Sequence, residues 1–203
     1  MNSPSHDPVC RTVDLMSLVD VFYAESNKLG QFVSVDSAPA PFDELLDHNA
    51  HMTVTVERYH RQPVDVAVHR TRHIDHQDVS HASEGLTLEQ LQAVDTRHYV
   101  REITLAGQQS KRVVQYGIVR LNVGALEPAV WREIEQQQTP LGRVLIEHDV
   151  LRDVSLCQLW RVTAGRALAT LLNIEVGETV FGRTAMIRCD GNPAIELLEI
   201  VVS

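Results

Sequence analysis

The chain has 203 residues, of which 44% are hydrophobic and 22% charged, and its formal net charge at pH 7 is −9. This composition is typical of a globular domain with a sizeable core. No apolar run in the sequence approaches the ~20 residues that a membrane-spanning helix needs. The negative net charge argues against a nucleic-acid-binding surface. The N-terminal residues lack the basic and apolar segments of a signal peptide. Three cysteines without a CxxC pair indicate reduced thiols, so we expect a cytoplasmic protein without a membrane span or a nucleic-acid partner.

The first part of the chain predicts a helix, a linker and then mixed elements. Apolar residues at helical spacing predict a helix over 11–27, and a Ser- and Pro-rich stretch over 34–41 is typical of a linker. We therefore assign residues 1–40 to an N-terminal helix and linker arm, and residues 41–203 to the main domain. A short helix over 42–47, strands over 52–59 and 64–70, and a polar loop over 71–95 with a short helix over 88–93 are predicted next. A loop of this length is typical of a lid or of a disordered segment.

Strand pairs dominate the second half of the chain. Strands are predicted over 99–105, 112–122, 154–162, 180–188 and 194–202, and helices over 128–138, 141–147 and 163–172. Strands joined by tight turns, with few helices between them, favour an antiparallel sheet with helices packed on one side. The predicted fold class is therefore α+β.

A buried arginine is the most informative feature of these strands. Tyr99, Arg101, Ile103 and Leu105 share one face because side chains alternate along a strand. A guanidinium among apolar neighbours costs several kcal/mol, to an order of magnitude, unless an anion meets it. The turn over 139–142 (Thr-Pro-Leu-Gly) offers backbone N–H groups to the same anion. A small carboxylate ligand completes such a site; an ion pair between Arg101 and a core carboxylate is the structural alternative.

Two glutamates on the last strand are candidates for a buried proton carrier, and Glu199 is also the core carboxylate that could pair with Arg101. Glu199 shares one face with Leu197 and Val201, whereas Glu196 shares the opposite face with Leu198. Alternation alone does not choose between them. Histidines also gather between residues 60 and 81, but none has the spacing of zinc ligands, so we expect a polar surface there and no metal site.

In their order and spacing, several segments resemble the chorismate lyase family, whose members are also called 4-hydroxybenzoate synthases. The matching pieces are Leu45-Leu46, Met52-Thr53, residues 99–105, 139–145 and 151–153, Gly182-Arg183, Gly191-Asn192-Pro193 and Glu199. The resemblance implies a six-stranded antiparallel sheet with a ligand enclosed under loops. It also implies a cofactor-free lyase that eliminates pyruvate from chorismate to give 4-hydroxybenzoate.

The resemblance also assigns roles to individual residues. Arg101 binds the ring carboxylate, and Glu199, counted from the Gly-x-Pro turn, handles the proton at the ring oxygen. Leu141 and Gly142 offer backbone amides and a close wall, since glycine lacks a side chain. Met52 packs against the ligand.

The chain departs from the family at a second arginine. The best-known members have Gly-Arg-Thr where this sequence has Gly117-Ile118-Val119-Arg120. Arg120 is displaced by two residues, which keeps its face of the strand but moves it about 7 Å along. We expect it either to bind the second substrate carboxylate or to be a solvated strand arginine. The displacement also allows a lyase for a related enolpyruvyl substrate.

A second resemblance points away from catalysis. Residues 169–180, Arg183 and the Asp190–Pro193 turn are similar to effector-binding domains of bacterial transcription regulators. Such domains share the lyase fold but sense small molecules without converting them. We expect the first 40 residues to be too short and too acidic for the basic DNA-binding domain of such a regulator. The alternative to the lyase is therefore a sensor for a small aromatic acid.

Overall fold

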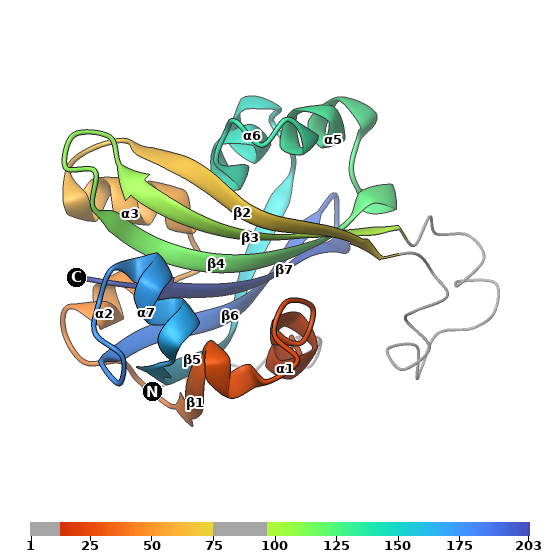
Figure 1. The fold of residues 1–203 in the computed structure, drawn as a ribbon. Coiled ribbons are helices and arrows are strands. Elements are labelled where there is room, and N and C mark those ends of the chain that lie inside the picture. Colours follow the sequence, from red (N-terminus) through yellow and green to blue (C-terminus); the bar gives the residue numbers. More distant parts are fainter. Residues whose placement is uncertain (1–12, 75–96) are drawn as a thin grey trace, which may run out of the picture.

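The computed structural model describes residues 13–74 and 97–203, which form one seven-stranded sheet (Figure 1). The strand order is β1-β5-β6-β7-β4-β3-β2, and every pair of neighbours is antiparallel. The strands are β1 Gly30–Val35, β2 Val64–Ile74, β3 His98–Gly107, β4 Val113–Asn122, β5 Arg152–Ala164, β6 Thr179–Cys189 and β7 Asn192–Val201. The α+β prediction is confirmed. The sheet has seven strands instead of six, because β1 adds an edge strand beside β5.

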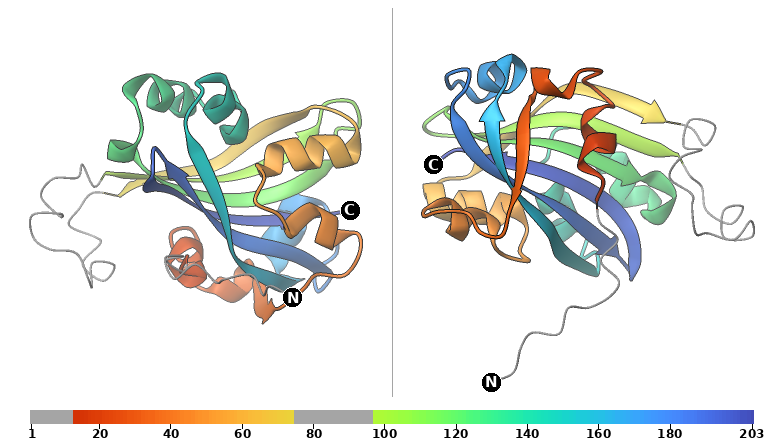
Figure 2. Two further views of the ribbon diagram at one scale, coloured as in Figure 1. Left: turned by 180° about the vertical axis from the view of Figure 1, so that it is seen from behind. Right: turned by 90° about the horizontal axis from the view of Figure 1, so that it is seen from below.

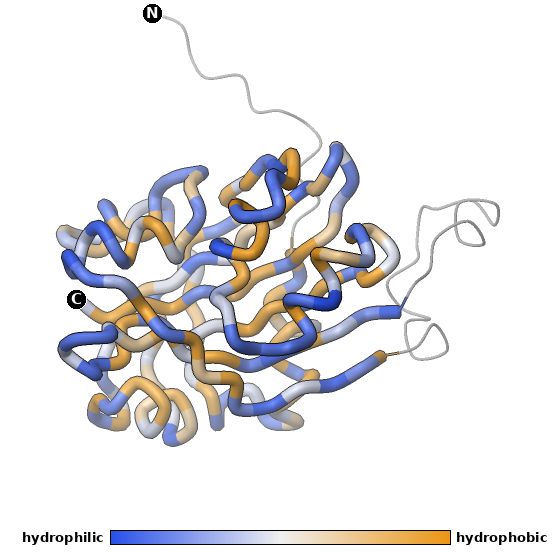
Figure 3. The backbone as a smooth tube through the Cα atoms, turned by 90° about the horizontal axis from the view of Figure 1, so that it is seen from above, coloured by the Kyte–Doolittle hydropathy of each residue, from blue (hydrophilic) through white to orange (hydrophobic). Residues whose placement is uncertain are grey.

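Helices cover the sheet unequally, as the view from behind shows (Figure 2). Most of the helical segments lie on one face, here called the α3/α6 face: α2 Phe42–Leu46, α3 Met52–His60, α5 Pro128–Glu135 and α6 Leu141–Glu147. The opposite face, here called the α1/α7 face, carries α1 Leu15–Val19 and α7 Arg166–Leu172. Each strand therefore sends alternate side chains into two separate parts of the core. In Figure 3 hydropathy accordingly changes repeatedly along the strands.

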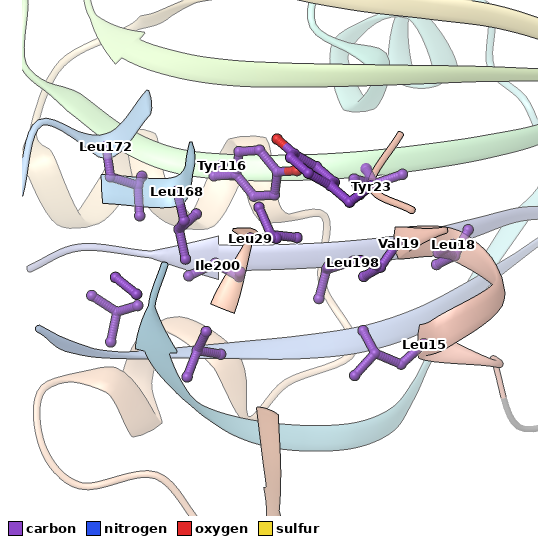
Figure 4. Close-up of a cluster of buried hydrophobic side chains, with 14 of the residues drawn as sticks. Leu15, Leu18, Val19, Tyr23, Leu29, Tyr116, Leu168, Leu172, Leu198 and Ile200 are labelled. Carbon is purple, nitrogen blue, oxygen red and sulfur yellow. The ribbon is translucent and has the colours of Figure 1, made fainter. Parts of the chain in front are cut away.

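The described residues of the predicted N-terminal arm pack against the sheet. Leu18 and Val19 of α1 are fully buried on the α1/α7 face, near Leu198 of the sheet (Figure 4). Helix α1 begins at a cap in which Asp14 Oδ1 accepts hydrogen bonds from two backbone N–H groups. It ends at Val19, earlier than predicted, and the chain then turns to bring Tyr23 over the sheet.

One predicted strand is a helix. Residues 52–60 form α3, although the run Thr53-Val54-Thr55-Val56 is rich in β-branched side chains that favour strands. Met52 and Val56 lie one helical turn apart and are buried against the sheet, while Val54 is exposed. Packing of this face therefore overrides the local propensity.

Two further expectations concern the linker and the loop. The predicted linker over 34–41 begins inside β1, which ends at Val35. Of the predicted loop over 71–95, residues 71–74 extend β2, and the rest, with its predicted helix over 88–93, lies outside the described residues. Within the described ranges, no helix is long and apolar enough to cross a membrane.

Candidate functional site

A cavity lies between the α3/α6 face of the sheet and the N-terminal turns of α3 and α6. About 40 Å³ of it is open to the centres of water molecules. The predicted site residues Met52, Arg101, Leu141, Gly142 and Glu199 all line it. Its remaining walls are Ala50, His51, Thr53, Ile103, Leu105, Gln115, Gly117, Val119, Val154, Arg183, Ile187 and Leu197.

Strand register explains why these side chains meet. Gly117 of β4 pairs with Ile103 of β3 and with Glu199 of β7, which in turn pairs with Arg183 of β6. This row crosses four strands and forms the floor of the cavity. Gly117 allows close packing in this row: a Cβ atom there would lie 3.4 Å from Ile103 Cγ1 and 3.2 Å from the Leu198 carbonyl oxygen.

Arg101 points into this cavity from the next row and is fully buried. Its Nε and Nη1 atoms have no hydrogen-bond partner, and no carboxylate in the described chain forms an ion pair with it. Burial lowers the pKa of the guanidinium, and the nearby Tyr99 acts weakly in the opposite direction. A buried cation without an anion costs several kcal/mol, to an order of magnitude. The side chain is therefore poised to meet an anionic ligand.

Glu199 is paired with Arg183 instead of Arg101. Arg183 Nε donates to Glu199 Oε2 at 2.7 Å. The two terminal nitrogens of Arg183 donate to the carbonyl oxygens of Leu46, His48 and Ala50 at 3.2, 2.6 and 3.2 Å. All three guanidinium nitrogens of Arg183 therefore form hydrogen bonds, which connect β6 to the chain before α3. Glu199 Oε1 forms no hydrogen bond with a described residue and remains available at the cavity.

Arg120 is not brought to the cavity. It lies on the α1/α7 face, where its guanidinium forms an ion pair with Glu196 and donates to Ser17 Oγ at 2.8 Å. Because the displacement is by two residues, Arg120 lies on the same face of β4 as Ile118. Ile118 packs in the core of the α1/α7 face, which is the face away from the cavity. The prediction that Arg120 binds substrate is therefore corrected. The same pairing separates the two glutamates, because only Glu199 faces the cavity.

The Thr-Pro-Leu-Gly turn supplies one wall, with a different use for its glycine. Helix α6 begins at Leu141, whose side chain is buried and lines the cavity. A Cβ atom on Gly142 would lie 2.9 Å from Thr53 Oγ1. The glycine therefore allows α6 to approach α3 closely, and this approach closes the cavity on the side opposite the sheet.

Sequence reasoning gave no site role to four polar lining residues, which are His51, Thr53, Gln115 and Arg183. Arg183 was detectable, because it and Glu199 are equidistant from the turn between β6 and β7. Gln115 was detectable from alternation, since it shares the face of Val119. His51 had no local signal, because its surroundings come from Arg152 and Arg183.

His51 is held as a neutral imidazole. Arg152 Nε donates to His51 Nε2 at 2.5 Å, and this contact requires an unprotonated ring nitrogen. Burial, together with the charges of Arg152 and Arg183, lowers the pKa of His51 to about 4. The cavity therefore contains one unpaired cation and a neutral histidine at neutral pH.

Comparison with known proteins identifies the fold of this chain but not its activity. No family model matches the chain, and no curated protein matches it. The effector domain of PhnF from Mycobacterium smegmatis is similar over 75% of this chain and 87% of its own, with 12% identity and a TM-score of 0.53. A structure of PhnF itself is similar over 76% of this chain but 64% of its own, with 11% identity and a TM-score of 0.54.

A further similarity is weaker. The ligand-binding domain of a protein from Bordetella bronchiseptica that is assigned to the GntR family of transcriptional regulators has 14% identity and a TM-score of 0.46, over 69% of this chain and 85% of its own. At these identities the similarities describe architecture. The chain has the fold of an effector domain and spans less than two thirds of the PhnF chain.

Proposed function

We propose that this chain binds a small organic acid in the Arg101 cavity as a sensor domain and does not convert it. The observation that carries the proposal is the fully buried Arg101 guanidinium with two unpartnered N–H atoms facing the cavity. A carboxylate can accept charged hydrogen bonds from these nitrogens and neutralise the buried guanidinium.

Two features support binding over turnover. The chain shares its fold with the effector domain of PhnF. The cavity is also small: at roughly 10–15 Å³ per water molecule, its 40 Å³ has room for about three waters, or for a carboxylate head group. A ligand with a ring must displace the side chains of Met52 or Leu141, and methionine adapts readily to such changes.

The second candidate is the cofactor-free lyase, and one observation favours it. Glu199 Oε1 is free of described partners in the same cavity as Arg101. In this reaction Arg101 holds the ring carboxylate of chorismate, and Glu199 handles the proton at the ring oxygen as pyruvate leaves. A lyase for a related enolpyruvyl substrate uses the same two residues.

One experiment separates these functions. Purified protein is incubated with chorismate while pyruvate and 4-hydroxybenzoate are followed, and binding of 4-hydroxybenzoate is measured by calorimetry. The sensor proposal predicts saturable binding without pyruvate release. Arg101→Met should weaken binding about a hundredfold, because two charged hydrogen bonds of about 1.5 kcal/mol each are lost.

The matched control is Arg161→Met, which removes an exposed arginine of β5 and should leave binding unchanged. Catalytic release of pyruvate by the parent, abolished in Arg101→Met, would replace the sensor with the lyase. If Arg101→Met bound the acid as tightly as the parent, both candidates would fail.

A further inference from the structure

Gln115 is the second unpaired polar side chain of the cavity. It lies on β4, is 3% exposed, and its Oε1 atom has no hydrogen-bond partner. Among the described residues that line the cavity, only Gln115 and Arg101 have buried polar side-chain atoms without a partner. A buried amide without a partner is costly, so its retention in a core position requires an explanation.

The two unpaired groups lie at opposite ends of the same hollow. Register pairs Val119 with Arg101 and Gln115 with Leu105, so Gln115 is two same-face steps along from Arg101. That separation is about 13 Å along the strands, before the side chains reach inward. Gly117 occupies the step between them and contributes no side chain. The Ile103 side chain packs over Gly117, so a ligand that reaches both groups must displace it.

The row between them does not satisfy either group. Glu199 lies beside Gly117, but its Oε2 is engaged by Arg183 Nε, and a carboxylate cannot donate to the Gln115 oxygen. Arg183, the other cation of the cavity, uses its nitrogens on Glu199 and on three carbonyl oxygens. Within the described chain, a donor for Gln115 Oε1 is missing.

We infer that Gln115 is a specificity-determining residue that reads a neutral hydrogen-bond donor, such as a hydroxyl group, at the end of the ligand opposite its carboxylate. This inference rests on the proposed function and narrows it to hydroxy acids. A hydroxyl donates to Oε1, whereas a methyl group of similar size leaves the amide unpaired. A second carboxylate at that end would lie one same-face step from Glu199 and would have no free cation, so dicarboxylates are disfavoured.

Matched acids test the inference on the unmodified chain. Calorimetry compares 4-hydroxybenzoate with 4-methylbenzoate, and 6-hydroxyhexanoate with heptanoate, and it includes terephthalate as a dicarboxylate. The hydroxy form of at least one pair should bind about tenfold more tightly or better, because its analogue leaves a buried polar group unpaired. Terephthalate should bind more weakly than 4-hydroxybenzoate. Equal affinities within both pairs would overturn the inference while leaving the acid-binding function intact.

Variants then assign the preference to one side chain. Gln115→Met keeps the size of the residue but removes its amide, so the preference for the hydroxy form should fall to within about twofold. Gln109→Met, an exposed glutamine in the turn between β3 and β4, is the matched control and should keep the preference. Thermal unfolding checks that both variants fold; if Gln115→Met does not, the comparison of acids on the parent still decides.

The failures are distinguishable. If the parent binds none of the five acids, the proposed function is wrong and the inference falls with it. If the acids bind and Gln115→Met retains the full hydroxyl preference, only the assignment to Gln115 is wrong.

Discussion

Arg101 and Glu102 are neighbours in sequence and opposites in environment. Both are buried in the middle of β3, but they point to different faces of the sheet. Arg101 meets no described anion on the α3/α6 face. Glu102, on the α1/α7 face, accepts hydrogen bonds from Arg70 at 2.6 and 2.8 Å, from Tyr23 at 2.5 Å and from Tyr116 at 2.8 Å. Figure 4 shows the two tyrosines side by side above the sheet.

The difference separates a structural charge from a functional one. The satisfied Glu102 network ties the segment after α1 to three strands, and Arg70 also stacks on the rings of Phe22 and Tyr23. Burial and the contact with Glu102 raise the pKa values of the Tyr23 and Tyr116 hydroxyls, so both remain donors. Arg101 has no such network, which is the arrangement expected when the partner is a ligand.

The largest loss of stability should come from disrupting the hydrogen-bond network around Glu102. Glu102→Leu removes the common acceptor of Arg70, Tyr23 and Tyr116, so the free energy of unfolding should fall by about 3 kcal/mol. Urea unfolding measures it, with Glu147→Leu on the exposed side of α6 as control. A change below about 1 kcal/mol would mean that the network is not structural.

Substitution of Arg101 should change the free energy of unfolding in the opposite direction. Replacing an unpaired buried charge with an apolar side chain removes its desolvation cost, so Arg101→Met should raise the free energy of unfolding of the ligand-free chain by about 1–2 kcal/mol. Arg183→Met, the same substitution at an engaged arginine, should destabilise the chain. If both variants were destabilised alike, Arg101 would have a structural partner, contrary to the comparison.

A smaller effect should come from one hydroxyl of the network. Tyr23→Phe removes a single donor to Glu102 while Tyr116 and Arg70 remain, so the loss should be about 1 kcal/mol. The measurement is again urea unfolding. A loss as large as that of Glu102→Leu would show that the segment after α1, and not the carboxylate, carries the stability.

The two faces should also lose stability in different pH windows. The pKa of His51 is lowered to about 4 from 6.5, so the unfolded chain binds its proton first and stability falls as pH drops from 6.5 towards 4. Burial acts to raise the pKa of Glu102, but its hydrogen bonds lower it below 4.5 overall. Its contribution is therefore complete above 4.5 and is lost as pH falls further.

Variants resolve the two windows by unfolding at a series of pH values. His51→Gln, whose amide oxygen still accepts from Arg152, should flatten the profile between pH 6.5 and 4. Glu102→Leu should flatten it below 4.5. An unchanged slope in His51→Gln would exclude His51 as the source of the upper window.

Much of the cavity was predictable because strands have a period of two. Alternation placed Arg101 inward, whereas the resemblance to the lyase family, and not alternation, chose Glu199 over Glu196. The tight turns likewise predicted the antiparallel pairs β3–β4 and β6–β7. These inferences depend on local geometry, which a sequence encodes directly.

The errors came from features that depend on distant contacts. Helix α3 was predicted as a strand because β-branched residues favour strands, and the local sequence does not show that this segment packs against a sheet. Of the two expectations for Arg120, substrate binding was wrong because Arg120 shares the face of Ile118, which packs in the core beneath α1. The lack of partners at Arg101 and Gln115 likewise depends on what other elements leave uncovered.

The most direct test observes the Arg101 guanidinium while an acid is added. The Nε–H resonance of Arg101, assigned by its loss in Arg101→Met, is followed by nitrogen-15 NMR during titration with 4-hydroxybenzoate. The account predicts a saturable shift of the Arg101 resonance, while that of Arg183, already bonded to Glu199, stays near its starting position. An unmoved Arg101 resonance while the acid binds, or a shift confined to Arg183, would contradict it.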